Sequence, residues 1–220
     1  MTIALIPVKR LEESKSRLFP QLSEARREAL TLAMLEDLIE ALSQTPGVDR
    51  IAVTTPDPVV AKHAQGAGAE ILIREEPGLN AALEDGRERL CNADTASDAS
   101  AEAFLIVLGD VAGALPEDFA KLIELADANR GVWLAPSSDG GTSALLQRPA
   151  TAIPCCFGRN SAKRHREAAE SAGVPFDEIP LASLAIDLDQ PEDLEAFRNT
   201  RGGGLRTRAL LEEFLDGAST

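Results

Sequence analysis

The chain has 220 residues, of which 44% are hydrophobic, and its 36 acidic and 22 basic residues give a formal net charge of −14. This length and apolar content suffice for one sizeable core, so we expect a single domain over residues 1–220. The acidic balance is a poor match for the phosphate backbone of nucleic acid, and no apolar run approaches the roughly 20 residues that span a bilayer.

The N-terminus and the cysteines narrow the cellular setting. The chain begins without the basic region, longer apolar region and cleavage site of a signal peptide, so we expect a cytoplasmic protein. Cys91, Cys155 and Cys156 are odd in number and lack metal-ligand spacing, which argues against a disulfide framework and a structural zinc site. We therefore expect reduced thiols in a protein that binds neither nucleic acid nor membrane.

Short apolar runs alternate along the chain with segments of helical periodicity. This alternation predicts an α/β fold, with a Rossmann-like, mostly parallel sheet and helices on both faces. In chain order, the first predicted elements are a strand over 2–8, a helix that Ser23 caps and Pro46-Gly47 ends, a strand over 50–54, a helix over 59–67, a strand over 70–73 and a helix over 79–91.

The second half of the chain continues the alternation after a small polar segment, 92–100, which we expect to be a surface loop within the domain. Residues 103–108 form the most apolar run and are predicted to be the central strand, buried on both faces. The later predicted elements are a helix over 117–129, strands over 132–135 and 142–147, a helix over 161–172, a helix from Pro191 and, after the glycines at 202–204, a last helix to Phe214.

A basic loop follows the first predicted strand of this acidic chain. It carries Lys9, Lys15 and Arg17. In an open α/β sheet, the loop that leaves the carboxyl end of a strand lies in the ligand crevice, so these side chains are placed to meet an anion. Triphosphate is the obvious candidate.

Three aspartates are candidate metal ligands. Asp110 follows the apolar run at 103–108, and Asp187 and Asp189 are spaced so that an extended backbone points both carboxylates to one side. Such carboxylates repel each other unless a cation lies between them, and three hard oxygen ligands suit magnesium. The alternatives are a turn role for Asp110 and helix capping before Pro191 for Asp189, but capping does not explain Asp187.

Two turns carry further candidate ligand groups. Asp139-Gly140-Gly141-Thr142 can present backbone N–H groups and a hydroxyl to an anion, although hairpin turns use such glycines routinely. Asn80 stands at a predicted helix start, where it could hydrogen-bond a nucleobase or ribose. Helix capping is an equally good account of Asn80.

The helix over 161–172 begins with an unusual charge pattern. Ser161 is predicted to cap it, and its first turns carry three cations and an imidazole: Lys163, Arg164, His165 and Arg166. Cations at a helix N-terminus oppose the macrodipole, so the cluster is more reasonable with an anion bound there. A solvated basic patch is the alternative, and His165 on its own is more typical of a structural role.

In this order the motifs resemble those of the guanylyltransferases of deazaflavin coenzyme F-420 biosynthesis, which look like small nucleotidyltransferases of the nucleotide-diphospho-sugar transferase (GT-A-like) fold. The resemblance runs nearly end to end. It is carried by Ile6-Pro-Val-Lys9 with Ser14-Lys-Ser-Arg-Leu18, Gly78-Leu-Asn80-Ala-Ala-Leu83, Gly109-Asp110, Ala135-Pro-Ser-Ser-Asp-Gly-Gly-Thr142, Phe157-Gly158 with Ser161 and Arg164-His165, and Asp187-Leu-Asp189-Gln-Pro-Glu-Asp-Leu194.

The resemblance implies transfer of GMP from GTP to the phosphate of a three-carbon phosphorylated acid, with release of pyrophosphate. It implies that magnesium is held by Asp110, Asp187 and Asp189, and the GTP phosphates by Lys9, Lys15 and Arg17. It places Asn80 near the nucleoside. The residues implied around the acceptor acid are Thr142, Gly158 and Ser161, with Gly141, Arg164 and His165 beside them.

The sequence also departs from the family pattern. Val111-Ala-Gly follows Asp110 where Leu-Pro is usual, Ser143 replaces a common asparagine, and Arg159-Asn160 replaces a Pro-Gly-like pair. The acceptor therefore stays open among phosphoenolpyruvate, 2-phospho-L-lactate and 3-phosphoglycerate. A molybdopterin or sugar phosphate as acceptor, and a catalytically silent nucleotide-binding regulatory domain, are the alternatives. A homodimer is compatible with the sequence, which does not fix the oligomeric state.

Overall fold

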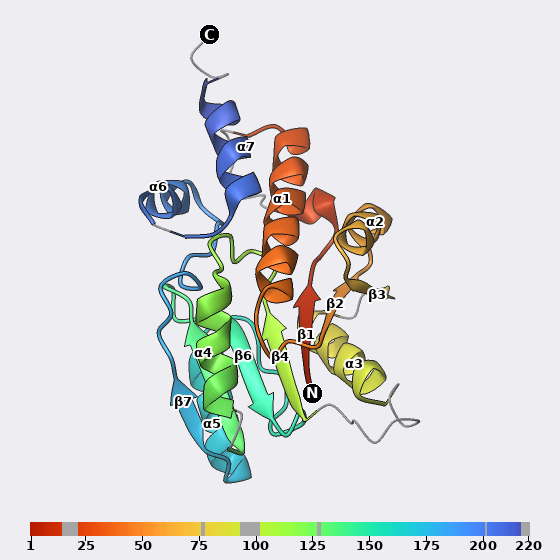
Figure 1. Ribbon diagram of the computed structural model, residues 1–220, viewed down its shortest axis with the longest axis vertical. Helices are drawn as coiled ribbons and strands as arrows, with labels where there is room; N and C mark the ends of the chain where they lie inside the picture. The colour runs from red at the N-terminus through yellow and green to blue at the C-terminus, as the bar shows by residue number, and fades with distance from the viewer. Residues whose placement is uncertain (15–21, 76–77, 93–101, 127–128, 201, 217–220) are drawn as a thin grey trace.

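The computed structural model describes residues 1–14, 22–75, 78–92, 102–126, 129–200 and 202–216. One seven-stranded sheet, in the order β3-β2-β1-β4-β6-β5-β7, runs through it (Figure 1). The strands are β1 (Thr2–Pro7), β2 (Arg50–Thr55), β3 (Glu70–Ile73), β4 (Ala103–Val107), β5 (Gly131–Pro136), β6 (Thr142–Arg148) and β7 (Phe176–Glu178). Every neighbouring pair is parallel except β4 with β6 and β5 with β6, so the predicted mostly parallel sheet is confirmed.

The middle of the sheet is the predicted central strand. All five residues of β4 are buried, which agrees with its position between β1 and β6. Strand β1 is buried over Thr2–Ile6, and its side chains alternate between the two faces of the sheet. Ala4 and Ile6 belong to one core cluster, whereas Ile3 and Leu5 belong to the other.

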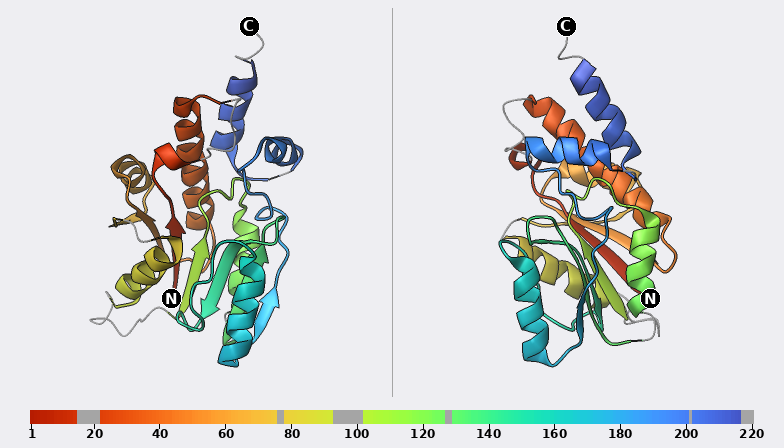
Figure 2. Two further views of the ribbon diagram at one scale, coloured as in Figure 1. Left: turned by 180° about the vertical axis from the view of Figure 1, so that it is seen from behind. Right: turned by 90° about the vertical axis from the view of Figure 1, so that its left-hand side faces the viewer.

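Helices cover both faces (Figures 1 and 2). The first face carries α1 (Glu24–Ser43), α2 (Pro58–Gly66) and α4 (Pro116–Ala126), and the opposite face carries α3 (Leu79–Asn92) and α5 (Ser161–Ala172). Local signals set the starts of two of these helices. The Ser23 hydroxyl accepts the Arg26 N–H at the start of α1, and the Asp57 carboxylate accepts the Val59 N–H at the start of α2.

Two helices lie beyond the carboxyl end of β1 and pack around the first half of α1 (Figure 2). They are α6 (Pro191–Asn199) and α7 (Leu205–Asp216). Phe197 of α6 and Leu211 and Phe214 of α7 form a third core cluster with residues of α1 that include Leu30 and Met34. Among the described helices, none combines the length and apolar character that crossing a membrane requires.

The structure contains elements that the sequence did not predict. Strand β7 and a 3-10 helix, η1 (Leu11–Glu13), have no counterpart among the predicted elements. Helix α4 is described over Pro116–Ala126, and Asn129, its predicted end, is not helical. The polar segment predicted as a surface loop lies, beyond its first residue, outside the described residues.

Candidate active site

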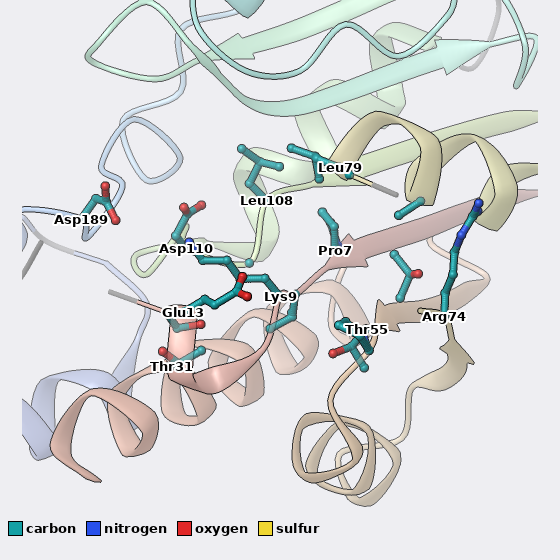
Figure 3. Close-up of a pocket in the computed structure, with 17 residues that line it drawn as sticks. Pro7, Lys9, Glu13, Thr31, Thr55, Arg74, Leu79, Leu108, Asp110 and Asp189 are labelled. Carbon is teal, nitrogen blue, oxygen red and sulfur yellow. The ribbon is translucent and has the colours of Figure 1, made fainter. Parts of the chain in front are cut away.

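A cavity of about 410 Å³ opens at the carboxyl ends of β1, β2 and β4. Figure 3 shows Lys9, Glu13, Asp110 and Asp189 gathered at one end of it, away from Arg74 at the other. This is where the crevice of an open α/β sheet is expected. One end of the cavity therefore offers a cation beside carboxylates, and the other is lined by Thr54 and Thr55 of β2 and by Arg74, which follows β3.

The loop that carries Lys9 is fastened to the neighbouring strand. The Val8 N–H donates to the Thr54 carbonyl oxygen at 3.0 Å, and the Leu11 N–H donates to the Asp57 carboxylate at 3.0 Å. Burial tends to raise the pKa of Asp57, but hydrogen bonds from backbone N–H groups outweigh it and hold this pKa below its ordinary value. The predicted phosphate ligand Lys9 thus lines the cavity, whereas Lys15 and Arg17 lie outside the described residues.

The candidate metal ligands come from two segments that lie against each other. The Leu188 N–H donates to the Asp110 carbonyl oxygen at 3.3 Å, and Val111 forms an isolated antiparallel bridge with Asp187. Asp110 and Asp189 line the cavity, and Asp187 is not among its lining residues. Over the described part of the chain, no three His, Cys, Asp or Glu residues converge as a metal-binding group, so a three-aspartate site stays a prediction.

The backbone after Asp110 is braced by the glycine segment before α7. A Cβ atom on Gly203 would lie 2.2 Å from the Ala114 carbonyl oxygen, and one on Gly204 would lie 2.3 Å from the Ala112 carbonyl oxygen. Only glycine permits so close an approach of two backbones. The C-terminal helix is therefore connected directly to the loop that presents Asp110.

A second cluster forms where β6 and α5 begin. The Ser161 hydroxyl donates to Thr142 Oγ1 at 2.9 Å, and His165 Nδ1 lies 3.2 Å from the same oxygen. The backbone N–H of Cys156 donates to His165 Nε2 at 3.0 Å. Thr142 and Ser161 are each 2% exposed, and His165 is wholly buried. The structure therefore brings together three residues predicted around the acceptor.

One of the predicted details at this end is wrong. Ser161 is not the N-cap of α5: Asn160 holds that position in the left-handed conformation, with φ 54°, and Ser161 turns its hydroxyl to Thr142 instead. The glycine turn before β6 has partners for two N–H groups within the turn, so its contact with an anion stays a prediction. Gly141 N–H donates to the Asp139 carboxylate at 2.9 Å, and Gly140 N–H donates to the Ser137 carbonyl oxygen at 3.1 Å.

Asn80 links the cavity wall to the Thr142 cluster. Its amide nitrogen donates to the Phe157 carbonyl oxygen at 3.0 Å, and its amide oxygen accepts the Phe157 N–H at 2.8 Å. Arg164 donates to the same carbonyl at 2.7 Å, and its guanidinium lies 3.0 Å from where a Cβ on Gly158 would be. The contact of Asn80 with a nucleoside stays a prediction, and its observed role is to hold the backbone beside Gly158.

Sequence reasoning missed the cavity wall formed by the ends of β2 and β3. Thr54, Thr55 and Arg74 line it. Arg74 Nη1 donates to the Ala81 carbonyl oxygen and pairs with the Asp85 carboxylate, both at 2.9 Å. The same crevice rule that singled out Lys9 and Asp110 applies to residues after the second and third strands, so this signal was present.

This architecture is that of the nucleotide-diphospho-sugar transferases and nucleotidyltransferases. The chain superposes with a TM-score of 0.74 on a crystal structure described as a nucleotide-diphospho-sugar transferase from Desulfovibrio desulfuricans G20, at 16% identity over 96% of this chain and 94% of that one. A nucleotidyl transferase from Methanothermobacter thermautotroptrophicus gives a TM-score of 0.61 at 16% identity, over 91% of this chain and 99% of that one. These likenesses confirm the predicted fold class.

Sequence comparison defines the family. The family model "Guanylyl transferase CofC like" matches residues 2–214, and the chain belongs to this family. A phosphoenolpyruvate guanylyltransferase of Sphaerobacter thermophilus is 39% identical over 88% of this chain and 91% of its own length. A 3-phospho-D-glycerate guanylyltransferase of Colwellia psychrerythraea is 32% identical over 88% of this chain and 90% of its own length. The family resemblance read from the motifs is thereby confirmed.

Proposed function

We propose that the protein transfers GMP from GTP to the phosphate of a three-carbon phosphorylated acid and releases pyrophosphate, as a step in coenzyme F-420 biosynthesis. The family match over residues 2–214 carries this proposal, and relatives named for phosphoenolpyruvate and for 3-phospho-D-glycerate support the class of acceptor. The cavity supports it physically, because Lys9 lies there beside Asp110 and Asp189.

The reaction joins two anions, so its main requirement is charge stabilisation. An oxygen of the acceptor phosphate attacks the α-phosphorus of GTP in line, a new P–O–P bond forms, and the bond to the pyrophosphate leaving group breaks. No protein nucleophile or proton transfer is needed. Lys9 binds the phosphates as their negative charge shifts toward the leaving group, and the fixed β1 loop holds Lys9 in place.

The carboxylates at this end fit magnesium as the cofactor. Mg²⁺ is commonly held by one or two carboxylates together with water and substrate phosphates. Asp110 and Asp189 line the cavity and supply hard oxygen donors, with Asp187 joined to the Asp110 loop by a backbone bridge. When bound, the ion would neutralise charge on the phosphates. These aspartates would hold it and thereby orient the GTP.

The Thr142 cluster is our proposed acceptor end. The family resemblance implies acceptor contacts for Thr142, Gly158 and Ser161, and Ser161 begins α5, a helix whose dipole favours an anion. Asn80 connects this end to the cavity wall through Phe157. A displacement of one end would therefore disturb the other, which suits an enzyme that must align two bound phosphates.

A direct assay tests the proposal. The purified protein is incubated with GTP, magnesium and, separately, phosphoenolpyruvate, 3-phosphoglycerate or 2-phospho-L-lactate. We expect pyrophosphate release with at least one acid, together with a product whose mass equals the acid plus GMP less water. Parallel reactions with ATP and CTP measure base selectivity. Absence of pyrophosphate with all three acids would refute the proposal.

A further inference from the structure

His165 has a different hydrogen-bond partner at each ring nitrogen, and the ring also interacts with the Ser161 backbone. The Cys156 N–H lies 3.0 Å from Nε2, and the Thr142 hydroxyl oxygen lies 3.2 Å from Nδ1. The ring is also packed edge-on against Phe157, with centroids 4.8 Å apart. Both partners and the packing fix the orientation of the imidazole.

The partners also determine where the ring carries its proton. A backbone N–H can only donate, so Nε2 must be the unprotonated nitrogen that accepts from Cys156. In a neutral ring the proton then resides on Nδ1, which faces Thr142 Oγ1 and the Ser161 backbone, so Nδ1 cannot accept the Thr142 hydroxyl proton. Burial, aided by the charge of Arg164 and opposed by a hydrogen bond with the Ser161 backbone, lowers the pKa of His165 to about 4. The ring is therefore neutral at physiological pH.

A count of protons shows what this tautomer does to the two hydroxyls. Thr142 and Ser161 carry two hydroxyl protons, and the 2.9 Å bond between them uses one. Because Nδ1 already carries a proton, neither hydroxyl proton is used on the imidazole, and among the described residues these hydroxyls make no other hydrogen bond. One hydroxyl proton is left over. With the opposite tautomer, Nδ1 would accept from Thr142, Thr142 would accept from Ser161, and none would remain.

We propose that His165 is a positioning residue that makes the Thr142–Ser161 pair a hydrogen-bond donor for an anionic oxygen of the phosphorylated acid. The proposal deepens the function proposed above and rests on it. Burial of both hydroxyl residues, each 2% exposed, limits competition from bulk water for the remaining proton. The Cys156 N–H thus fixes the tautomer of His165, and this tautomer makes the Thr142–Ser161 pair a hydrogen-bond donor. His165 itself does not touch the acid.

Two isosteric substitutions separate the two hydrogen bonds of His165. Asn places an amide near the position of Nδ1 and can still donate to Thr142, which keeps the Thr142 hydroxyl proton directed away from the ring. Gln reaches the position of Nε2 and can accept only from Cys156, so nothing holds the Thr142 hydroxyl in its donor orientation. We expect KM for the acid to be about tenfold higher in His165→Gln than in His165→Asn, while KM for GTP stays the same in both. His63→Gln, at an exposed position on α2, is the matched control and should change neither constant.

Equal KM values for the acid in the Gln and Asn variants would overturn the proposal, because they would reduce His165 to a packing role. Should either variant fail to fold, nitrogen NMR of the wild-type protein decides. The chain has two histidines, so the buried ring is readily assigned. We expect it to be protonated on Nδ1 between pH 5 and 7, and protonation on Nε2 would overturn the proposal. Failure of the proposed function is distinct, because the wild-type protein would then release no pyrophosphate with any of the acids.

Discussion

Asp37 of α1 and Thr207 of α7 are joined by two hydrogen bonds of 2.8 Å, one from the Thr207 backbone N–H and one from its hydroxyl. The Arg206 N–H donates to the same carboxylate at 3.1 Å. Asp37 is 7% exposed, and this buried acid of α1 acts as a capping side chain for α7. The glycines before α7 lie against the backbone that follows Asp110, which connects this cap to the candidate active site.

Replacing Asp37 should therefore loosen α7. We expect Asp37→Ala to lower the free energy of unfolding by about 2–4 kcal/mol, because it leaves buried donors of Thr207 without an acceptor. Glu40→Ala is the matched control: Glu40 also pairs with Arg206 but is 48% exposed, so its loss should cost under about 1 kcal/mol. Urea denaturation measures both, and equal losses would contradict a special role for Asp37.

Gly204 is the second test of this connection. Gly204→Ala places a Cβ 2.3 Å from the Ala112 carbonyl oxygen at a residue whose φ is +78°, so the backbone after Asp110 must shift. We expect a loss of about 1–3 kcal/mol in stability and a lower kcat. Gly66→Ala, with open space around the added methyl group, should change stability by no more than about 1 kcal/mol. If Gly204→Ala is destabilised but keeps the wild-type kcat, the contact of the α7 segment with the Asp110 loop does not affect catalysis.

Most elements were predictable because their signals are local. The Ser23 cap, the proline and glycine stops and the apolar run of β4 each lie within or directly beside the element they define. Strand β7 carries no such signal: its three residues are half-buried or exposed, and its order comes from pairing with Val132–Leu134. The reversed direction of β6 within the sheet is likewise a property of distant pairing and has no local signature.

The candidate site was predictable as a set of residues but not as a set of contacts. Strand ends placed Lys9 and Asp110 at one cavity because the crevice of an open sheet follows from topology. Ser161 looked like a helix cap because its residue type suits one, yet its hydroxyl bonds Thr142, 19 residues away. The role of His165 depends on a backbone N–H at Cys156, and no spacing in the sequence reveals that bond.

Lys9 is exposed and lines the cavity, so its removal should affect binding more than folding. We expect Lys9→Ala to raise KM for GTP about tenfold or more, the loss typical of a charge-assisted hydrogen bond to phosphate, with an unchanged Tm. Lys62→Ala removes a cation from the exposed surface of α2 and should leave KM for GTP unchanged. If Lys9→Ala lowers the Tm but leaves KM for GTP unchanged, Lys9 has a structural role and does not bind the GTP phosphates.

Asp110 should be essential for turnover if it holds the cofactor. We expect Asp110→Asn to reduce kcat about 100-fold or more and to weaken the magnesium-dependent part of GTP binding, as measured by calorimetry. Glu117→Gln, an exposed change of the same charge in the first turn of α4, is the matched control and should keep wild-type values. Magnesium-dependent binding that survives in Asp110→Asn would exclude Asp110 as a ligand.

The buried imidazole of His165 predicts a loss of stability in mild acid. Its pKa falls from 6.5 to about 4 in the folded protein, so between these values the unfolded chain takes up a proton that the folded one does not. The stabilisation is complete above pH 6.5, is lost as the pH falls toward 4, and amounts to roughly 3 kcal/mol. Urea titrations at pH 7, 5.5 and 4.5 should show this slope in the wild-type protein and not in His165→Asn. Ordinary carboxylates contribute mainly below this window, so a wild-type protein equally stable at pH 7 and 4.5 would mean that His165 is readily protonated in the folded state.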